Sequence, residues 1–254
     1  VYLKSDGSIR ATGKNDYGQL GDGTTTDRSS PVQVVDAGGS PLAGVGWISG
    51  GQHHTTYLKS DGTVWAVGNN GIGQLGEGTT VNRLQPGHLK DTSGMTLTGV
   101  SGVALGDDHT VYLKSDGTVW AVGKNDSGQL GDGTTTDRSN PVQVVDAGGT
   151  PLSNVSAFSA GRNHTVFLNS DGTAWATGYN YYGGLGDGST TDRTNPVQVI
   201  DAGGSPLSNV SVISAGGYHT VFLKGAGTVW ATGTNDYGQL GDGSTTKTSN
   251  PVQV

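Results

Sequence analysis

The chain has 254 residues, 46 of them Gly, with only 14% charged residues and a formal net charge of −7. Lys and Arg are scattered, so no basic stripe indicates nucleic-acid binding, and no apolar run approaches the ~20 residues that span a bilayer. The absence of Cys excludes disulfides and thiolate metal sites.

One pattern repeats along the whole sequence. The chain opens inside a copy, and further copies follow with a constant spacing of 55 residues, at His54, His109, His164 and His219. A fixed period of this length is typical of solenoids and propellers. We therefore expect one repeat domain over 1–254, made of an incomplete repeat and four complete ones: 1–44, 45–99, 100–154, 155–209 and 210–254.

Alternating apolar residues predict four strands in each complete repeat. In the repeat that begins at Val155 they cover 155–160, 164–168, 173–177 and 196–200. Asp171-Gly172 supplies the tight turn between the second strand and the third. Pro196 begins the fourth strand, which should therefore lie outermost, and the strand at Val155 should lie innermost. No segment has a helical period.

This pattern predicts an all-β chain, a β-propeller of four-stranded antiparallel blades with about five 55-residue repeats. The first repeat lacks its first strand, so 19 strands are expected. We expect the chain to be part of a longer propeller or repeat array. A closed five-blade ring that lacks one strand is the alternative.

Three motifs recur in phase: G-x-x-H-T, S-D-G-T-V-W-A-x-G-x-N and G-Q-L-G-D-G. Together they resemble the regulator of chromosome condensation repeat over the whole chain. The resemblance implies a propeller, usually of seven blades. Its known members are small-GTPase exchange factors, ubiquitin-ligase adaptors, a plant ultraviolet photoreceptor and a bacterial β-lactamase inhibitor. The photoreceptor needs Trp after the first Gly of G-x-x-H-T, where this chain has Gln52, Asp107, Arg162 and Gly217.

The in-phase histidines and tryptophans have structural interpretations. Equivalent histidines on neighbouring blades would lie ~10 Å apart, too far to share a metal ion, so we expect imidazoles packed between blades and bonded to the backbone. One Trp per repeat at a strand centre predicts core packing between sheets. These are Trp65, Trp120, Trp175 and Trp230.

The long loops carry aspartates that calcium would accept as ligands: Asp22, Asp27, Asp132, Asp137, Asp187, Asp192 and Asp242. The D-x-D-x-D-G spacing of a dedicated calcium loop is absent, however, so a structural turn is favoured. No unrepeated acid, base or nucleophile cluster is present. We therefore assign no catalytic, cofactor or metal residues and expect no enzyme activity.

Residues that differ between otherwise similar repeats are the candidates for binding, because loops on a rigid scaffold carry specificity. The predicted partner-binding residues are Tyr17, Trp47, Tyr179, Tyr182, Tyr218 and Tyr237. Relaxed constraint on exposed loops would give the same variation.

The preferred function is a non-catalytic propeller scaffold that binds a protein partner through variable loops on one face. A structural or display segment of a bacterial extracellular or surface protein is one alternative, and a proteinaceous enzyme inhibitor is another. The chain is expected outside the cell or at the bacterial surface, without membrane insertion. Self-association through open propeller ends is a further expectation.

Overall fold

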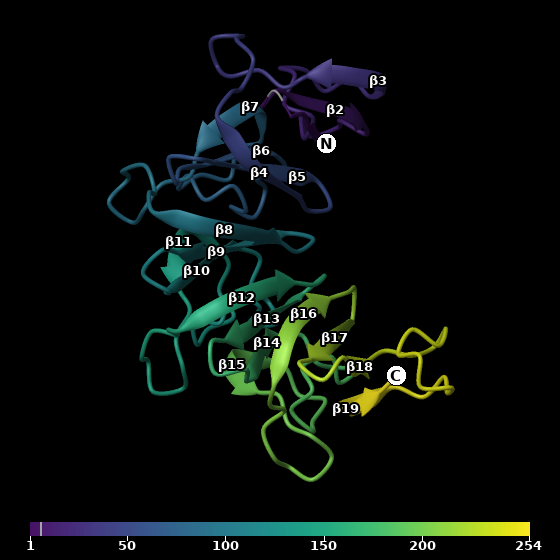
Figure 1. Cartoon of the computed structure of the whole chain (residues 1–254). Helices are drawn as coiled ribbons and strands as arrows, with labels where there is room; N and C mark the ends of the chain where they lie inside the picture. The colour runs from purple at the N-terminus through teal and green to yellow at the C-terminus, as the bar shows by residue number, and fades with distance from the viewer. Residues whose placement is uncertain (6) are drawn as a thin grey trace. The chain divides into compact units, whose positions relative to one another are not determined.

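The computed structural model describes residues 1–5 and 7–254, and within these residues all regular structure is β-strand (Figure 1). The strands are β1 (Tyr2–Leu3), β2 (Ile9–Gly13), β3 (Arg28–Gln33), β4 (Val45–Gly50), β5 (His54–Lys59), β6 (Val64–Gly68), β7 (Arg83–His88), β8 (Val100–Leu105), β9 (His109–Lys114), β10 (Val119–Gly123), β11 (Arg138–Gln143), β12 (Val155–Ala160), β13 (His164–Asn169), β14 (Ala174–Gly178), β15 (Arg193–Gln198), β16 (Val210–Ala215), β17 (His219–Lys224), β18 (Val229–Gly233) and β19 (Thr248–Gln253).

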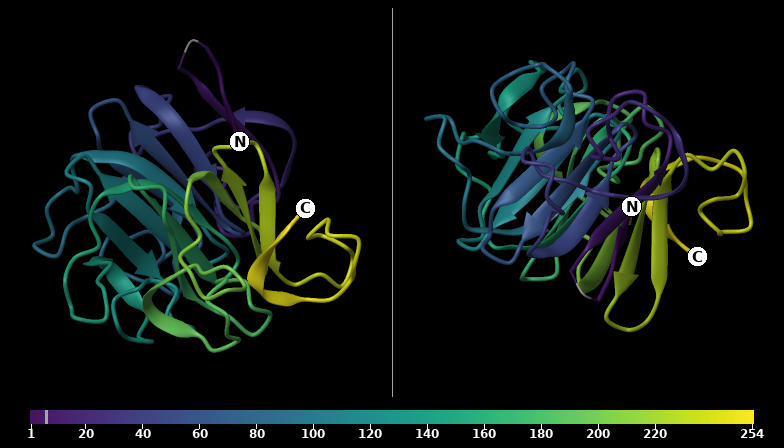
Figure 2. Two further views of the ribbon diagram at one scale, coloured as in Figure 1. Left: turned by 60° about the horizontal axis from the view of Figure 1, so that its bottom comes forward. Right: turned by 90° about the horizontal axis from the view of Figure 1, so that it is seen from above.

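Each sheet consists of strands that follow one another in the sequence, as the gradual colour change within a sheet shows (Figure 2). The described residues form a three-stranded sheet, β1-β2-β3, and four four-stranded sheets, β4 to β7, β8 to β11, β12 to β15 and β16 to β19. The strand pairs within the last two sheets are antiparallel. The predicted all-β class, four-stranded repeat unit and 19 strands are confirmed in this part of the chain.

Two compact parts can be distinguished. Residues 1–116, 122–124 and 137–142 form the first, and residues 117–121, 125–136 and 143–254 form the second. In the first part β4 packs against β8, and in the second β12 packs against β16. These strands begin successive repeats, so their contact is the one expected of innermost strands. The assignment of one domain to residues 1–254, and the closure of the ring, stay predictions.

The fourth strand of a repeat differs from its predicted bounds. β15 covers Arg193–Gln198, whereas residues 196–200 were expected. Its pairing with β14 is interrupted between Ala176 and Gly178, and Pro196 lies inside this irregularity. A proline lacks an N–H to donate, so it fits an edge strand where the ladder is broken. The edge position is therefore confirmed, but Pro196 does not begin the strand.

The core of the second part lies between its two complete sheets. Phe222 of β17 is fully buried against Val166, Leu168 and Ala176 of the preceding sheet. The tryptophans lie further out than predicted. Trp230 is only partly buried at the margin of the same core, and its Nε1–H donates to Thr228 at 3.2 Å. The fully buried aromatic of each complete repeat is instead the fourth residue of the His-Thr strand: Tyr57, Tyr112, Phe167 and Phe222.

A histidine–threonine relay joins successive repeats. His164 Nε2 lies 3.1 Å from Thr220 Oγ1, and Thr220 donates its hydroxyl proton to the Gly184 carbonyl at 2.7 Å. The Thr hydroxyl therefore accepts from His164, which must carry its proton on Nε2. His54 and Thr110 repeat this contact at 3.0 Å in the first part. The predicted packing is thus confirmed, but the imidazole bonds a side-chain hydroxyl and not the backbone.

One prediction concerns the buried tyrosine hydroxyls. The Oη atoms of Tyr57 and Tyr112 are buried, and neither has a hydrogen-bond partner among the described residues. A buried unsatisfied hydroxyl costs about 1 kcal/mol or more, and later repeats carry Phe at this position. Tyr57→Phe should therefore raise the free energy of unfolding in urea by about 1 kcal/mol. Tyr237→Phe, at a 94% exposed residue, is the neutral control. A loss of stability in Tyr57→Phe would reveal a partner for the hydroxyl.

A second prediction concerns acid stability. Burial, with a smaller effect of the nearby His219, lowers the pKa of His164 to about 4. The unfolded chain binds this proton near pH 6.5, so the stabilisation is complete above that pH and is lost as the pH falls towards 4. Between pH 7 and pH 5 the protonation of this one histidine in the unfolded chain should lower the free energy of unfolding by about 2 kcal/mol.

Urea unfolding at the two pH values tests this. His164→Gln should shrink the pH-dependent loss, and His219→Gln should shrink it less, because His219 is only partly buried. An unchanged pH dependence in His164→Gln would contradict the prediction.

Candidate binding site

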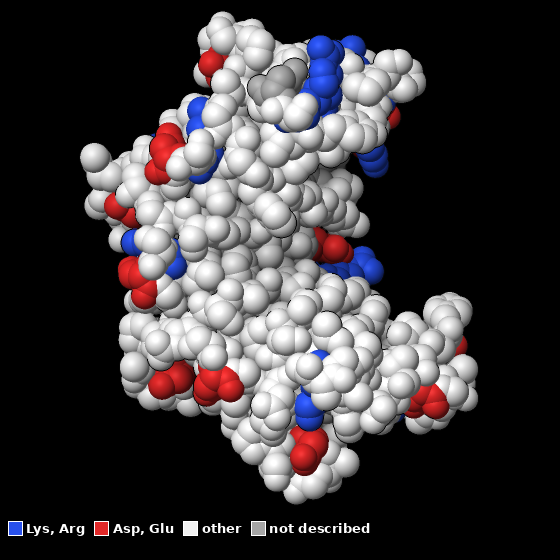
Figure 3. Space-filling model, viewed as in Figure 1, with Lys and Arg blue, Asp and Glu red and all other residues white. Residues whose placement is uncertain are grey.

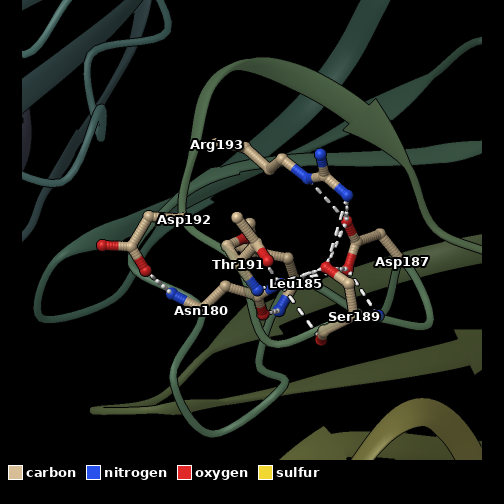
Figure 4. A network of polar contacts seen from close by, with 7 residues as sticks. All are labelled: Asn180, Leu185, Asp187, Ser189, Thr191, Asp192 and Arg193. Atoms are coloured by element: carbon tan, nitrogen blue, oxygen red, sulfur yellow. Dashed lines mark hydrogen bonds and ion pairs between the residues drawn. The ribbon is translucent and has the colours of Figure 1, made fainter.

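A buried asparagine organises the long loop between the third and fourth strands (Figure 4). Asn180 Nδ2 donates to the carbonyl oxygens of Ser189 and Thr191 at 3.2 and 3.1 Å and to Asp187 Oδ1 at 3.0 Å. Its Oδ1 accepts from Leu185 N at 3.0 Å. One fully buried side chain therefore fixes four separate points of the loop, and the loop can hold exposed residues in place around it.

The loop aspartates are used within this network. Asp187 pairs with Arg193 at 2.7 Å, and Asp192 Oδ1 accepts from Asn180 N at 2.7 Å. Burial alone would raise the pKa of Asp187, but hydrogen bonds from Ser189 and Arg193 outweigh it and lower that pKa. In the described residues no group of three or more His, Cys, Asp or Glu side chains is placed to hold a metal ion. The geometry supports the structural-turn interpretation of these loops.

Four tyrosine rings gather beside this loop in the second part. Tyr179, Tyr181 and Tyr182 come from the loop after β14, and Tyr218 comes from the turn before β17. The ring centroids of Tyr179 and Tyr182 lie 5.5 and 5.4 Å from that of Tyr218, and Tyr181 meets Tyr182 edge to face at 5.1 Å. These four residues are called the tyrosine cluster.

Two cations lie over the tyrosine cluster. Arg162 Cζ, from the turn after β12, lies 5.6 Å from the Tyr218 ring centroid. Lys247 Nζ, from the loop before β19, lies 4.7 Å from Tyr181 and 5.5 Å from Tyr182. Such distances favour cation–π attraction. Elsewhere, Lys and Arg on the face shown in Figure 3 are scattered among Asp and Glu and form no continuous basic stripe.

The tyrosine cluster combines partly buried and exposed rings. Burial raises the pKa of Tyr179, with smaller effects of Tyr182 and Tyr218. Tyr181 is 58% exposed, so its ring is presented to solvent. Tyrosine combines a large rigid apolar face with a polar tip and is enriched at the energetic centres of interfaces. The cluster has the chemistry of a protein-binding surface.

The predicted binding residues separate into three groups. Tyr179, Tyr182 and Tyr218 come together in the cluster. Tyr17 makes the same kind of contact in the first part, with its ring 5.0 Å from His53. Tyr237 is 94% exposed with no ring contact in the described structure, and Trp47 is 59% exposed on β4, away from the loops.

Sequence reasoning missed Tyr181 and did not connect Lys247 with the tyrosines. Both stand where other repeats carry mostly acidic residues: Asp126 is in phase with Tyr181, and Asp192 is in phase with Lys247. Such a departure from the repeat was the available signal. It shows that a position differs, but not that side chains from two repeats meet.

Repeated four-stranded antiparallel sheets, joined through their first strands, place the chain in the β-propeller class of repeat proteins. The model of the regulator of chromosome condensation (RCC1) repeat matches residues 6–58, 61–113, 116–168, 171–223 and 226–254. The chain belongs to this family. The resemblance inferred from the motifs is therefore confirmed.

Relatives and solved structures agree with this assignment. The chain is 32% identical to the ultraviolet-B receptor UVR8 of Arabidopsis thaliana over 96% of its length and 53% of the receptor. It is 34% identical to the human probable E3 ubiquitin-protein ligase HERC3 over 78% of its length and 18% of the ligase. The chain thus spans about half of the first relative and less of the second.

Among solved structures, human WBSCR16 matches 99% of the chain and 63% of that protein, with a TM-score of 0.81 and 25% identity. Yeast RCC1, solved with Kap60, matches 100% of the chain and 59% of that protein, with a TM-score of 0.77 and 19% identity. The second likeness shows the fold alone. Over the described residues no helix is long and apolar enough to cross a membrane.

A prediction follows from the loop network. Asn180→Ala removes the side-chain contacts that hold the loop and leaves the buried Leu185 N–H without its acceptor, so it should lower the free energy of unfolding by about 3 kcal/mol. Urea denaturation measures this. Asn209→Gly is the control, because Asn209 is exposed at a φ of 58° where glycine fits without strain. A change below about half a kcal/mol in Asn180→Ala would show that the loop does not depend on this side chain.

Proposed function

We propose that this chain is a non-catalytic propeller scaffold that binds a protein partner through the tyrosine cluster. The observation that carries the proposal is the convergence of four tyrosines and two cations from two successive repeats at the ends of their strands. Rigid aromatic residues with arginine beside them are the usual energetic centre of a protein interface. They offer large contact area with few rotatable bonds.

Family membership supports a binding role. The solved complex of yeast RCC1 with Kap60 contains a protein with this fold in contact with a protein partner. The residues that build the sheets recur in every repeat, whereas the cluster residues do not. A partner without the same internal repetition is therefore recognised by the residues that differ between repeats.

The enzyme-inhibitor function is a special case of the same proposal, in which the partner is an enzyme. A display function at a bacterial surface would not require the cluster to bind. The extracellular or surface location stays a prediction, since the relatives named above come from a plant and from humans.

The proposal is tested by photo-cross-linking and then by affinity. A photoreactive phenylalanine analogue in place of Tyr181 should cross-link to a partner. The control carries the same analogue in place of Asp171, in the hairpin turn at the opposite end of the strands, and should not cross-link to that partner. With that partner purified, Tyr181→Ala and Tyr218→Ala should each weaken binding by ~1–3 kcal/mol in calorimetry.

Stability provides the control for this test. Tyr181→Ala should leave the melting temperature nearly unchanged, because its ring is mostly exposed. Tyr237→Ala, an exposed tyrosine outside the cluster, should leave the affinity unchanged. Full affinity in the Tyr181→Ala, Tyr218→Ala double variant would refute the proposal and favour the display function.

A further inference from the structure

The charge of the tyrosine cluster differs from that of the same positions in other repeats. Arg162 and Lys247 place two cations beside the tyrosine cluster, and these six residues together include no carboxylate. One repeat earlier the equivalent positions contain a single cation, Lys124, and three carboxylates: Asp107, Asp126 and Asp192. Two repeats earlier they contain Asp108, Asp137 and no cation. The chain has a net charge of −7, and the summed charge of these positions is negative in the two earlier sets but positive at the cluster.

Lys247 shows the structural cost of this change. At the in-phase position Asp192 accepts the backbone N–H of Asn180 at 2.7 Å, and Asp27 does the same for Asn15 at 2.7 Å. Lys247 cannot accept, and no side chain takes this role for the backbone N–H of Asn235 in the part of the chain described. The lysine reaches over Tyr181 and Tyr182 of the preceding repeat instead. Lysine in place of aspartate therefore removes a hydrogen bond to the Asn235 backbone N–H and places a cation beside the tyrosine cluster.

The environment of Lys247 leaves this charge uncompensated. Its side chain is exposed, and the described residues place no carboxylate within salt-bridge distance of it. Asp192 is the one carboxylate that contributes to the raised pKa of Tyr179, and it is held by Asn180. A surface that places a cation beside aromatic rings is complementary to a ligand that carries an anionic group next to an apolar group. Carboxylates of a protein segment supply both features when they flank an aromatic side chain.

We infer that the tyrosine cluster recognises an acidic segment of its protein partner. Carboxylates of that segment pair with Lys247 and Arg162, and an aromatic or aliphatic side chain between them packs on the tyrosine rings. The inference rests on the proposed function and specifies the chemistry of the partner. It assigns Lys247 as the residue that determines specificity, with Arg162 as a second contact.

A synthetic peptide tests the inference without the natural partner. The probe is acetyl-Gly-Glu-Glu-Phe-Glu-Glu-Gly-amide, and two matched peptides replace every Glu by Gln or by Lys. The full chain is labelled with carbon-13 on its tyrosine rings and titrated at low ionic strength. The acidic peptide should shift the signals of Tyr179, Tyr181, Tyr182 and Tyr218 in a saturable way and leave that of Tyr237 unchanged. Added salt should weaken the effect, because it screens exposed charges.

The decisive variant is Lys247→Asp. Aspartate is the residue that repeats 1, 3 and 4 carry here, so the substitution restores an acceptor for Asn235 N–H and should not weaken the fold. It should weaken binding of the acidic peptide by about tenfold or more. Lys224→Asp is the matched control: it makes the same change in net charge at a lysine whose Nζ lies 5.4 Å from the Trp230 ring, outside the cluster. The control should bind like the parent chain.

Three results would overturn the inference. The acidic peptide leaves the cluster signals unmoved, the Gln or Lys peptide binds as well as the acidic one, or Lys224→Asp weakens binding as much as Lys247→Asp. Binding of the Gln or Lys peptide at the cluster would still support a protein-binding surface, so it separates failure of this inference from failure of the proposed function. That function is judged by the cross-linking and affinity experiment.

Discussion

The buried asparagine of each long loop is the constraint on which the exposed face depends. A loop that runs from one strand to the edge strand carries backbone groups that water cannot reach, and these must find partners. In the fourth repeat Asn180 satisfies several of them at once, and in the first repeat Asn15 makes the same set of contacts. Because the loop is held from inside, its outward residues are free to vary. Three of the four tyrosines of the cluster occupy such outward positions of the loop that Asn180 holds.

The second constraint is the junction between repeats. The histidine of one repeat donates to the threonine of the next, and that threonine donates to a carbonyl in the loop of its predecessor. The threonine therefore makes hydrogen bonds with both the second strand and the long loop of the preceding repeat. A buried neutral imidazole suits this role at neutral pH. In acid the unfolded chain binds protons that the buried imidazole does not bind, so the free energy of unfolding falls. Adjacent repeats therefore share one source of acid sensitivity.

Much of the architecture could be predicted from the sequence, because period-two alternation and Asp-Gly turns are local signals. The strands at Val155 and His164 begin where they were expected. The bulge around Pro196 was not predictable, since a break in the ladder depends on the partner strand. The depth of Trp230 was misjudged for a similar reason: alternation gives the face of a strand but not how far the neighbouring sheet extends over it. Three of the four cluster tyrosines were predicted, whereas Tyr181 and the neighbouring Lys247 become meaningful only when two repeats are placed side by side.

The relay also has a consequence for how such a chain changes over generations. His54 reaches Thr110 and His164 reaches Thr220 across the same separation of 56 residues, with nearly the same geometry. These two junctions, one in each compact part, therefore make the same contact. A genetic exchange that deletes, duplicates or transposes one whole unit rejoins compatible ends and keeps the scaffold intact. Only the outward residues are rearranged, so new recognition surfaces can arise by shuffling units, without the slow accumulation of point substitutions.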